Sequence, residues 1–88
     1  MNIWNDITLP NIAIYRYEKL ERILISVCKD ADVLPYMVKG RRRLTVLVQA
    51  RVAFSRQAKS KGYTLKQIGK HIGRDHSSIL HYLHEYET

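Results

Sequence analysis

Two short helical patterns joined by a glycine turn restrict this chain more than any other feature of its sequence. In the first pattern, apolar side chains recur at the spacing of one helix face, and Thr64 and Gln67 fit a capping box. Gly73 follows it and suits the left-handed conformation that ends many helices. Asp75 can then cap a second helix. The sequence therefore predicts a helix-turn-helix over about residues 64–86.

The second helix of this pair is expected to have one apolar face and one small polar face. Ile79, Leu80 and Leu83 are spaced so that they share the side facing the core. The other side carries short hydroxyl groups and imidazoles, which can approach the edges of DNA bases closely. These side chains belong to His76, Ser77, Ser78 and His81. Within the first helix, Gly69 would allow a neighbouring helix to approach closely.

Basic charge is concentrated in one continuous segment of the chain. The 88 residues carry a formal net charge of +7, and residues 33–74 contain eleven Lys and Arg but no Asp or Glu. A solvated protein surface normally mixes both signs of charge, so this segment indicates a polyanionic partner, of which nucleic acid is the leading class. A membrane surface is the weaker alternative, because no basic helix here has a broad face of Trp, Phe and Leu.

Three further helices are predicted upstream from apolar spacing and from helix-end signals. The first covers residues 15–29. Asp32 is expected to cap a short helix over residues 33–38, with Pro35 tolerated in its first turn. The longest helix is expected over residues 45–61. Its predicted buried stripe consists of Val46, Leu47, Ala50, Ala53, Phe54 and Ala58.

The chain is expected to form one small all-α domain of about five helices. The domain comprises residues 15–88. Residues 1–14 show no clear period and are expected to form an N-terminal arm, either irregular or a short helix, that packs through Trp4. No apolar run approaches the roughly 20 residues that a membrane span needs. The single cysteine, Cys28, excludes an internal disulfide, suits a buried position and fits a reducing cytoplasm.

The predicted helix-turn-helix contains a specific order of residues. It reads Thr64-Leu65, Ile68-Gly69 and Gly73-Arg74-Asp75-His76-Ser77-Ser78-Ile79-Leu80-His81. This order resembles the end of the C-terminal DNA-binding domain of the bacterial replication initiator DnaA, which has Thr-Thr-Val in place of residues 77–79. The resemblance continues more weakly upstream to about residue 20, and the family's ATPase module has no counterpart in this sequence. It implies a helical bundle like those of the Trp repressor and the DnaA C-terminal domain.

A basic loop, Arg41-Arg42-Arg43, precedes the longest predicted helix. Three adjacent arginines repel one another, so an ordinary solvated loop is one interpretation. The other is an arginine that enters a minor groove or binds phosphate. The resemblance implies a minor-groove arginine, and counting back without a gap places Arg42 there, with Arg43 as the near alternative. The family often has Arg-Gln early in the following helix, where this chain has Ala50-Arg51. Arg51 is therefore the expected contact to the DNA backbone in that helix.

The resemblance also implies roles within the helix-turn-helix. Asp75 would accept a hydrogen bond from a cytosine amino group, and His76 and Ser77 would contact thymine or neighbouring bases. Thr offers a methyl group to the thymine methyl and Ser does not, so the preferred site is expected to differ from that of the family or to be read less tightly. The first helix of such a pair crosses the DNA backbone. The remaining candidates for contact with phosphate or flanking bases are Lys66, Gln67, Lys70, Arg74, Ser78 and His81.

Other chemistry has little support in this sequence. The four histidines and one cysteine lack the paired spacing of structural zinc sites, and Ser77 beside His76 lacks the turn of a catalytic serine. No glycine-rich phosphate loop is present, so we expect no bound nucleotide, no cofactor, no metal and no enzymatic activity. We expect sequence-specific binding of double-stranded DNA, in replication or its regulation or in transcription regulation. The alternatives are a protein-interaction module that binds a replication or mobile-element protein, and an accessory DNA-targeting subunit of a transposition or recombination system.

Overall fold

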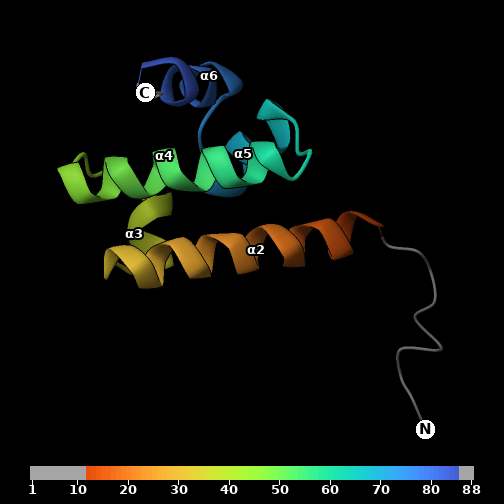
Figure 1. The fold of residues 1–88 in the computed structure, drawn as a ribbon, viewed down its shortest axis with the longest axis horizontal. Helices are drawn as coiled ribbons and strands as arrows, with labels where there is room; N and C mark the ends of the chain where they lie inside the picture. Colours follow the sequence, from red (N-terminus) through yellow and green to blue (C-terminus); the bar gives the residue numbers. More distant parts are fainter. Residues whose placement is uncertain (1–11, 86–88) are drawn as a thin grey trace, which may run out of the picture.

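Five α-helices make up the part of the chain that the structure describes, residues 12–85, and no strand occurs in that part. The structure is a computed structural model in which side chains are described from residue 19 to residue 84. The helices are α2 (Ile12–Ala31), α3 (Pro35–Lys39), α4 (Thr45–Ser60), α5 (Leu65–Ile72) and α6 (His76–Glu85). Figure 1 shows α4 in the middle of the molecule, with α2 on one side of it and α6 on the other. The expected all-α class and number of helices are confirmed.

The core lies where α2, α4, α5 and α6 face one another. From α2 it receives the apolar stripe that the spacing predicts: Leu24 is fully buried, and Leu20, Val27 and Cys28 are nearly so. Burial also raises the pKa of the Cys28 thiol, consistent with the buried position expected for it. Each buried Leu or Val side chain stabilises the fold by about 1.5–3 kcal/mol relative to an exposed position. The other helices complete the core with Leu47, Ala50, Phe54, Ala58, Ile68, Ile72 and Ile79.

The start of the described chain changes one expected boundary. Helix α2 begins at Ile12, three residues earlier than expected, so residues 12–14 of the N-terminal arm are helical. The rest of that arm, including Trp4, lies outside the described residues, as does residue 86 at the end of the expected helix-turn-helix. None of the described helices is both long enough and apolar enough to cross a membrane.

The end of α2 corrects the role expected for Asp32. Its backbone is in the left-handed region, with φ 57°, and its N–H donates to the Lys29 carbonyl at 3.3 Å. The next N–H, of Val33, donates to the Cys28 carbonyl at 3.0 Å. These two bonds form a Schellman motif, which places Asp32 after the end of α2. Asp32 therefore does not cap α3, whose N-cap residue is Leu34 and makes no side-chain capping bond.

Helix α4 has 16 residues and α2 has 20, so the expectation that α4 is the longest helix is wrong. Five of the six residues of the expected buried stripe of α4 are buried or partly buried, but Val46 is 39% exposed. Val46 precedes the buried Leu47 by one residue, which turns it about 100° away from the core. The helix ends at Ser60, and Gly62 follows with a φ of 94°, which favours glycine.

Helix α5 and the turn after it have the end structures that the sequence predicts. The Thr64 hydroxyl accepts from the Gln67 N–H at 3.1 Å, and the Gln67 side chain accepts from the Thr64 N–H at 2.9 Å. Gly73 has a φ of 71° and ends the helix. A Cβ atom at Gly69 would overlap the carbonyl oxygen of Arg74. Gly69 thus allows the turn, rather than a second helix as expected, to lie against α5.

Helix α6 turns only part of its expected apolar face to the core. Ile79 is fully buried and Leu83 is partly buried against the core, but Leu80 is 43% exposed. Leu80 lies one residue, and so about 100°, from Ile79. Its assignment to the core-facing side was wrong.

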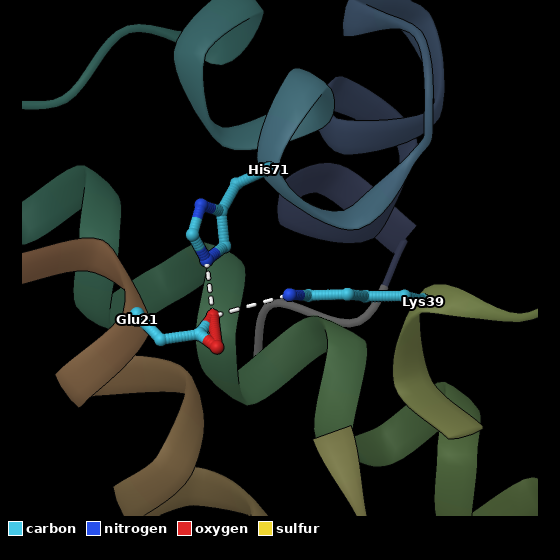
Figure 2. A network of polar contacts seen from close by, with 3 residues as sticks. All are labelled: Glu21, Lys39 and His71. Atoms are coloured by element: carbon cyan, nitrogen blue, oxygen red, sulfur yellow. Dashed lines mark hydrogen bonds and ion pairs between the residues drawn. The ribbon is translucent and has the colours of Figure 1, made fainter. Parts of the chain in front are cut away.

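A polar contact that the sequence did not predict joins three helices (Figure 2). One carboxylate oxygen of Glu21 on α2 lies 2.8 Å from His71 Nε2 on α5 and 3.2 Å from the Lys39 ammonium on α3. The His71 side chain is only 2% exposed, and its ring stacks on Phe54 at a centroid distance of 5.7 Å. Because an ionised carboxylate only accepts hydrogen bonds, Nε2 must carry the proton in this contact. The interaction fixes α5 against α2.

Candidate nucleic-acid interface

A groove of about 490 Å³ lies along the first turns of α6, and we call it the α6 groove. It is bounded by the basic loop, by α4, and by the turn that leads from α5 into α6. Its polar lining consists of Arg43, Arg51, Arg74, Asp75, Ser77, Ser78 and His81, and its apolar lining of Val48 and Tyr82. Seven of the twelve DNA-contact candidates thus lie together, although they are scattered over almost forty positions of the sequence.

Asp75 caps α6, as its position in the sequence predicts. Its carboxylate accepts from the Ser78 N–H at 2.8 Å. Hydrogen bonds from the Ser78 N–H and from the Ser78 hydroxyl, followed by the charge of His76, hold the pKa of Asp75 below its ordinary value of 3.8. The carboxylate is exposed and ionised, so it can accept a further hydrogen bond from outside the protein.

The polar face of α6 is presented outward beside this cap. His76 and Ser77 are exposed, and so is His81, whose ring lies 6.4 Å from that of Tyr82. Ser78 is half-buried because it serves the Asp75 cap. The face therefore combines hydroxyl, imidazole and carboxylate groups on one rigid helix end, where both donors and acceptors are available to a base edge.

The basic loop places its arginines differently with respect to α6. Arg41, Arg42 and Arg43 are all exposed, but Arg43 lines the α6 groove and Arg42 does not. From the sequence, either Arg42 or Arg43 is the candidate for the arginine that enters a minor groove. The geometry brings Arg43 alongside Ser77 and His81.

Arg51 is buried, although the sequence predicts it to be a contact to the DNA backbone. It is 1% exposed, and its guanidinium donates to the carbonyls of Val38 at 2.9 Å, Met37 at 3.3 Å and Gly40 at 3.0 Å. Burial, and then the positive charge of Arg74, lower the pKa of Arg51. Its spacing was the overlooked signal. Arg51 follows Leu47 by four residues and therefore falls on the same helix face.

Arg74 also makes contacts within the protein. Its guanidinium donates to the Gly40 carbonyl at 2.5 Å and to the Gly73 carbonyl at 3.3 Å. Arg74 remains half-exposed at the edge of the α6 groove, so it contributes positive charge to the groove while bonding the end of α3.

The candidates on α5 lie outside the α6 groove. Lys66 and Lys70 are exposed and four residues apart, so they share one side of the helix. The side-chain oxygen of Gln67 is held by the capping box, which gives this residue a structural role. The exposed lysines are thus placed to add positive charge beside the helix-turn-helix.

The structure adds three groups that were not DNA-contact candidates from the sequence: Tyr82 and Val48 in the groove wall, and the carbonyl of Gly40, which accepts a bond from Arg51. Among the described side chains, no group of three histidine, cysteine or acidic residues is placed to hold a metal ion. Comparison with protein-family models, with curated proteins and with solved structures finds no match to this chain.

Proposed function

We propose that this protein binds double-stranded DNA in a sequence-specific manner, with α6 in the major groove. The observation that carries the proposal is the α6 groove. It sets Arg43 of the basic loop beside an outward-facing helix end that carries Asp75 and Ser77. A helix of this kind fits the major groove of B-DNA, and arginines beside it can bind phosphate or a minor groove. The resemblance of residues 64–81 to the DNA-binding domain of DnaA supports the same function.

In this proposal the contacts divide into two groups. Asp75, His76 and Ser77 contact base edges, with Asp75 accepting from a cytosine amino group. Phosphate or a minor groove is contacted by Arg42, Arg43, Lys66, Lys70, Arg74, Ser78 and His81. The absence of acids from residues 33–74 supports the second group, because nothing in that segment would repel phosphate. Action in replication, its regulation or transcription regulation, within the cytoplasm, belongs to the same proposal.

A second candidate function is contact with a protein from a replication or mobile-element system, including service as an accessory DNA-targeting subunit. Large apolar side chains that remain exposed favour it. Around the start of α3 and the start of α4 these are Leu34, Tyr36, Leu44 and Val46. DNA binding and protein contact are compatible on one small domain, because the α6 groove contains none of these four side chains.

Selection of bound sequences from random duplex DNA, followed by salt titration on the selected site, tests the proposal. If about five side chains contact phosphate, log affinity should fall with log salt at a slope near −4.5. The selected sites should share a common core. Binding without sequence preference, or no binding even at low salt, would reject sequence-specific DNA recognition.

A further inference from the structure

The carbonyl group of Gly40 joins two parts of the candidate DNA-binding surface. It accepts hydrogen bonds from Arg51 at 3.0 Å and from Arg74 at 2.5 Å. Gly40 directly precedes the basic loop, and Arg74 directly precedes Asp75, the cap of α6. One carbonyl and two guanidinium groups thus connect the start of the loop to the start of α6. We call this arrangement the Gly40 clamp.

Arg51 anchors the Gly40 clamp in the core. It also bonds the carbonyls of Met37 and Val38, which belong to the end of α3. The last carbonyls of a helix have no partner within the helix, so these bonds satisfy groups that would otherwise be left open. The planar guanidinium can reach several carbonyls at once, whereas a lysine ammonium is a single point charge on a flexible stem. The geometry of the loop therefore depends on an arginine at this position.

We propose that Arg51 is a positioning residue for DNA recognition: through the Gly40 clamp it fixes the basic loop relative to α6. Arg51 itself contacts no DNA, because it is buried and its guanidinium is directed at backbone carbonyls. The clamp sets the number of base pairs that separate the contacts of the loop from the contacts of α6. This inference rests on the proposed DNA binding and adds a spacing requirement to it.

A set of duplexes tests the spacing requirement. Each keeps the bases selected by α6 and moves the A·T-rich segment read by the loop by one base pair at a time. Arg51→Lys keeps the charge and removes the forked geometry, and Arg56→Lys, at an exposed position on the same helix, is the matched control. We expect the parent and Arg56→Lys to prefer one spacing by about tenfold, comparable to one mismatched base pair, and Arg51→Lys to prefer it by less than about threefold.

A second measurement needs no DNA. In ¹⁵N relaxation, the amides of residues 40–44 should have order parameters near those of a rigid backbone, about 0.85, in the parent, and should fall toward about 0.6 in Arg51→Lys. If Arg51→Lys does not fold, Arg74→Lys provides the same test, because it weakens only the hydrogen bond from the half-exposed Arg74 to the Gly40 carbonyl.

The outcomes separate this inference from the proposed function. A parent protein that binds no duplex overturns the proposed function, and the spacing role with it. The positioning role alone is overturned if the parent binds with a spacing preference and Arg51→Lys keeps that preference and the order of the loop. A salt slope that becomes shallower by about 0.9 in Arg51→Gln, while the loop amides stay as ordered as in the parent, also overturns it, because the lost contact to phosphate is then that of Arg51 itself.

Discussion

His71 donates a hydrogen bond from Nε2 to the Glu21 carboxylate at 2.8 Å, across fifty positions of the sequence and within the core of the molecule. Burial lowers the pKa of His71 from its ordinary value of 6.5, although the contact with Glu21 opposes this change. Burial raises the pKa of Glu21, but the bonds from His71 and Lys39 outweigh it, so the pKa lies below 4.5. Both groups therefore bind protons less readily in the folded state than in the unfolded state.

This linkage predicts that acid destabilises the protein. As pH falls below 6.5, the unfolded state takes up a proton on His71 before the folded state does, and the free energy of unfolding decreases. The contribution of Glu21 is present above pH 4.5 and is lost as pH falls through its lowered folded pKa. Thermal unfolding followed by circular dichroism should give a lower Tm at pH 5.5 than at pH 7.5.

A glutamine at position 71 separates the histidine contribution from general acid effects. His71→Gln does not titrate, so its Tm should change less between pH 7.5 and pH 5.5 than that of the parent. His84→Gln, at an exposed position on α6, should keep the parent's pH dependence. Equal pH dependence in His71→Gln and the parent would show that another group is responsible.

Gly69→Ala should destabilise the domain by about 3 kcal/mol, at the upper end for an overpacked site. The added Cβ would overlap the Arg74 carbonyl oxygen and lie 3.2 Å from backbone atoms of Asp75, neither of which belongs to a flexible side chain. Gly62→Ala is the matched control, since its Cβ meets nothing within 4 Å and only the positive φ of 94° opposes it, at about 1–2 kcal/mol. Urea denaturation measures both. A smaller loss for Gly69→Ala than for Gly62→Ala would contradict the close approach of the turn.

The sequence predicts local structure well where one side chain and its own backbone decide it. The capping box of Thr64 and Gln67 and the left-handed Gly73 are examples, because their bonds close within a few residues. Prediction from the sequence fails where contacts with other helices decide whether a side chain is buried. Spacing alone assigned Leu80 to the core, although its side chain is 43% exposed. The residue type of Arg51 suggested a surface position, whereas carbonyls from α3 hold it inside.

The assembly of the α6 groove could not be predicted from local patterns either. Arg43 and Ser77 are separated by more than thirty residues, and they meet only because α4 packs against both α3 and α6. The chemical character of the candidate interface, basic with a small polar helix face, is predictable from the sequence. The tertiary structure determines which arginine of the basic loop lies beside that face.

Arg43→Ala should weaken binding to the selected site more than Arg42→Ala does. Arg43 lines the α6 groove beside the helix proposed to read the bases, whereas Arg42 is exposed outside the groove. A base-specific arginine is worth about 1–3 kcal/mol, and a phosphate contact weakens binding to all sequences alike. Fluorescence anisotropy with the selected site and with random duplex distinguishes the two effects. A larger, site-specific loss in Arg42→Ala would instead support the ungapped register of the family resemblance.

Asp75→Asn should change base preference without changing the fold. Asp75 is the only acid between Asp32 and Glu85, and it lies in a groove lined by three arginines. An acid that faces DNA is repelled by phosphate unless a base donates a hydrogen bond to it, and the cytosine amino group is the natural donor in the major groove. Asparagine keeps an oxygen for the Ser78 N–H, so the α6 cap and the Tm should be retained.

Asp75→Asn should therefore bind random duplex at least as tightly as the parent, because one negative charge is removed from the interface. At the selected site it should lose about 1–3 kcal/mol of preference at one C·G pair. Competition with single-base variants of the site measures that preference position by position, and Asp75→Ala, which loses the cap as well, shows how much of any change comes from α6 itself. If the base preferences of Asp75→Asn equal those of the parent at every position, Asp75 serves only as the helix cap. Recognition would then depend on His76 and Ser77, the exposed side chains that follow it on α6.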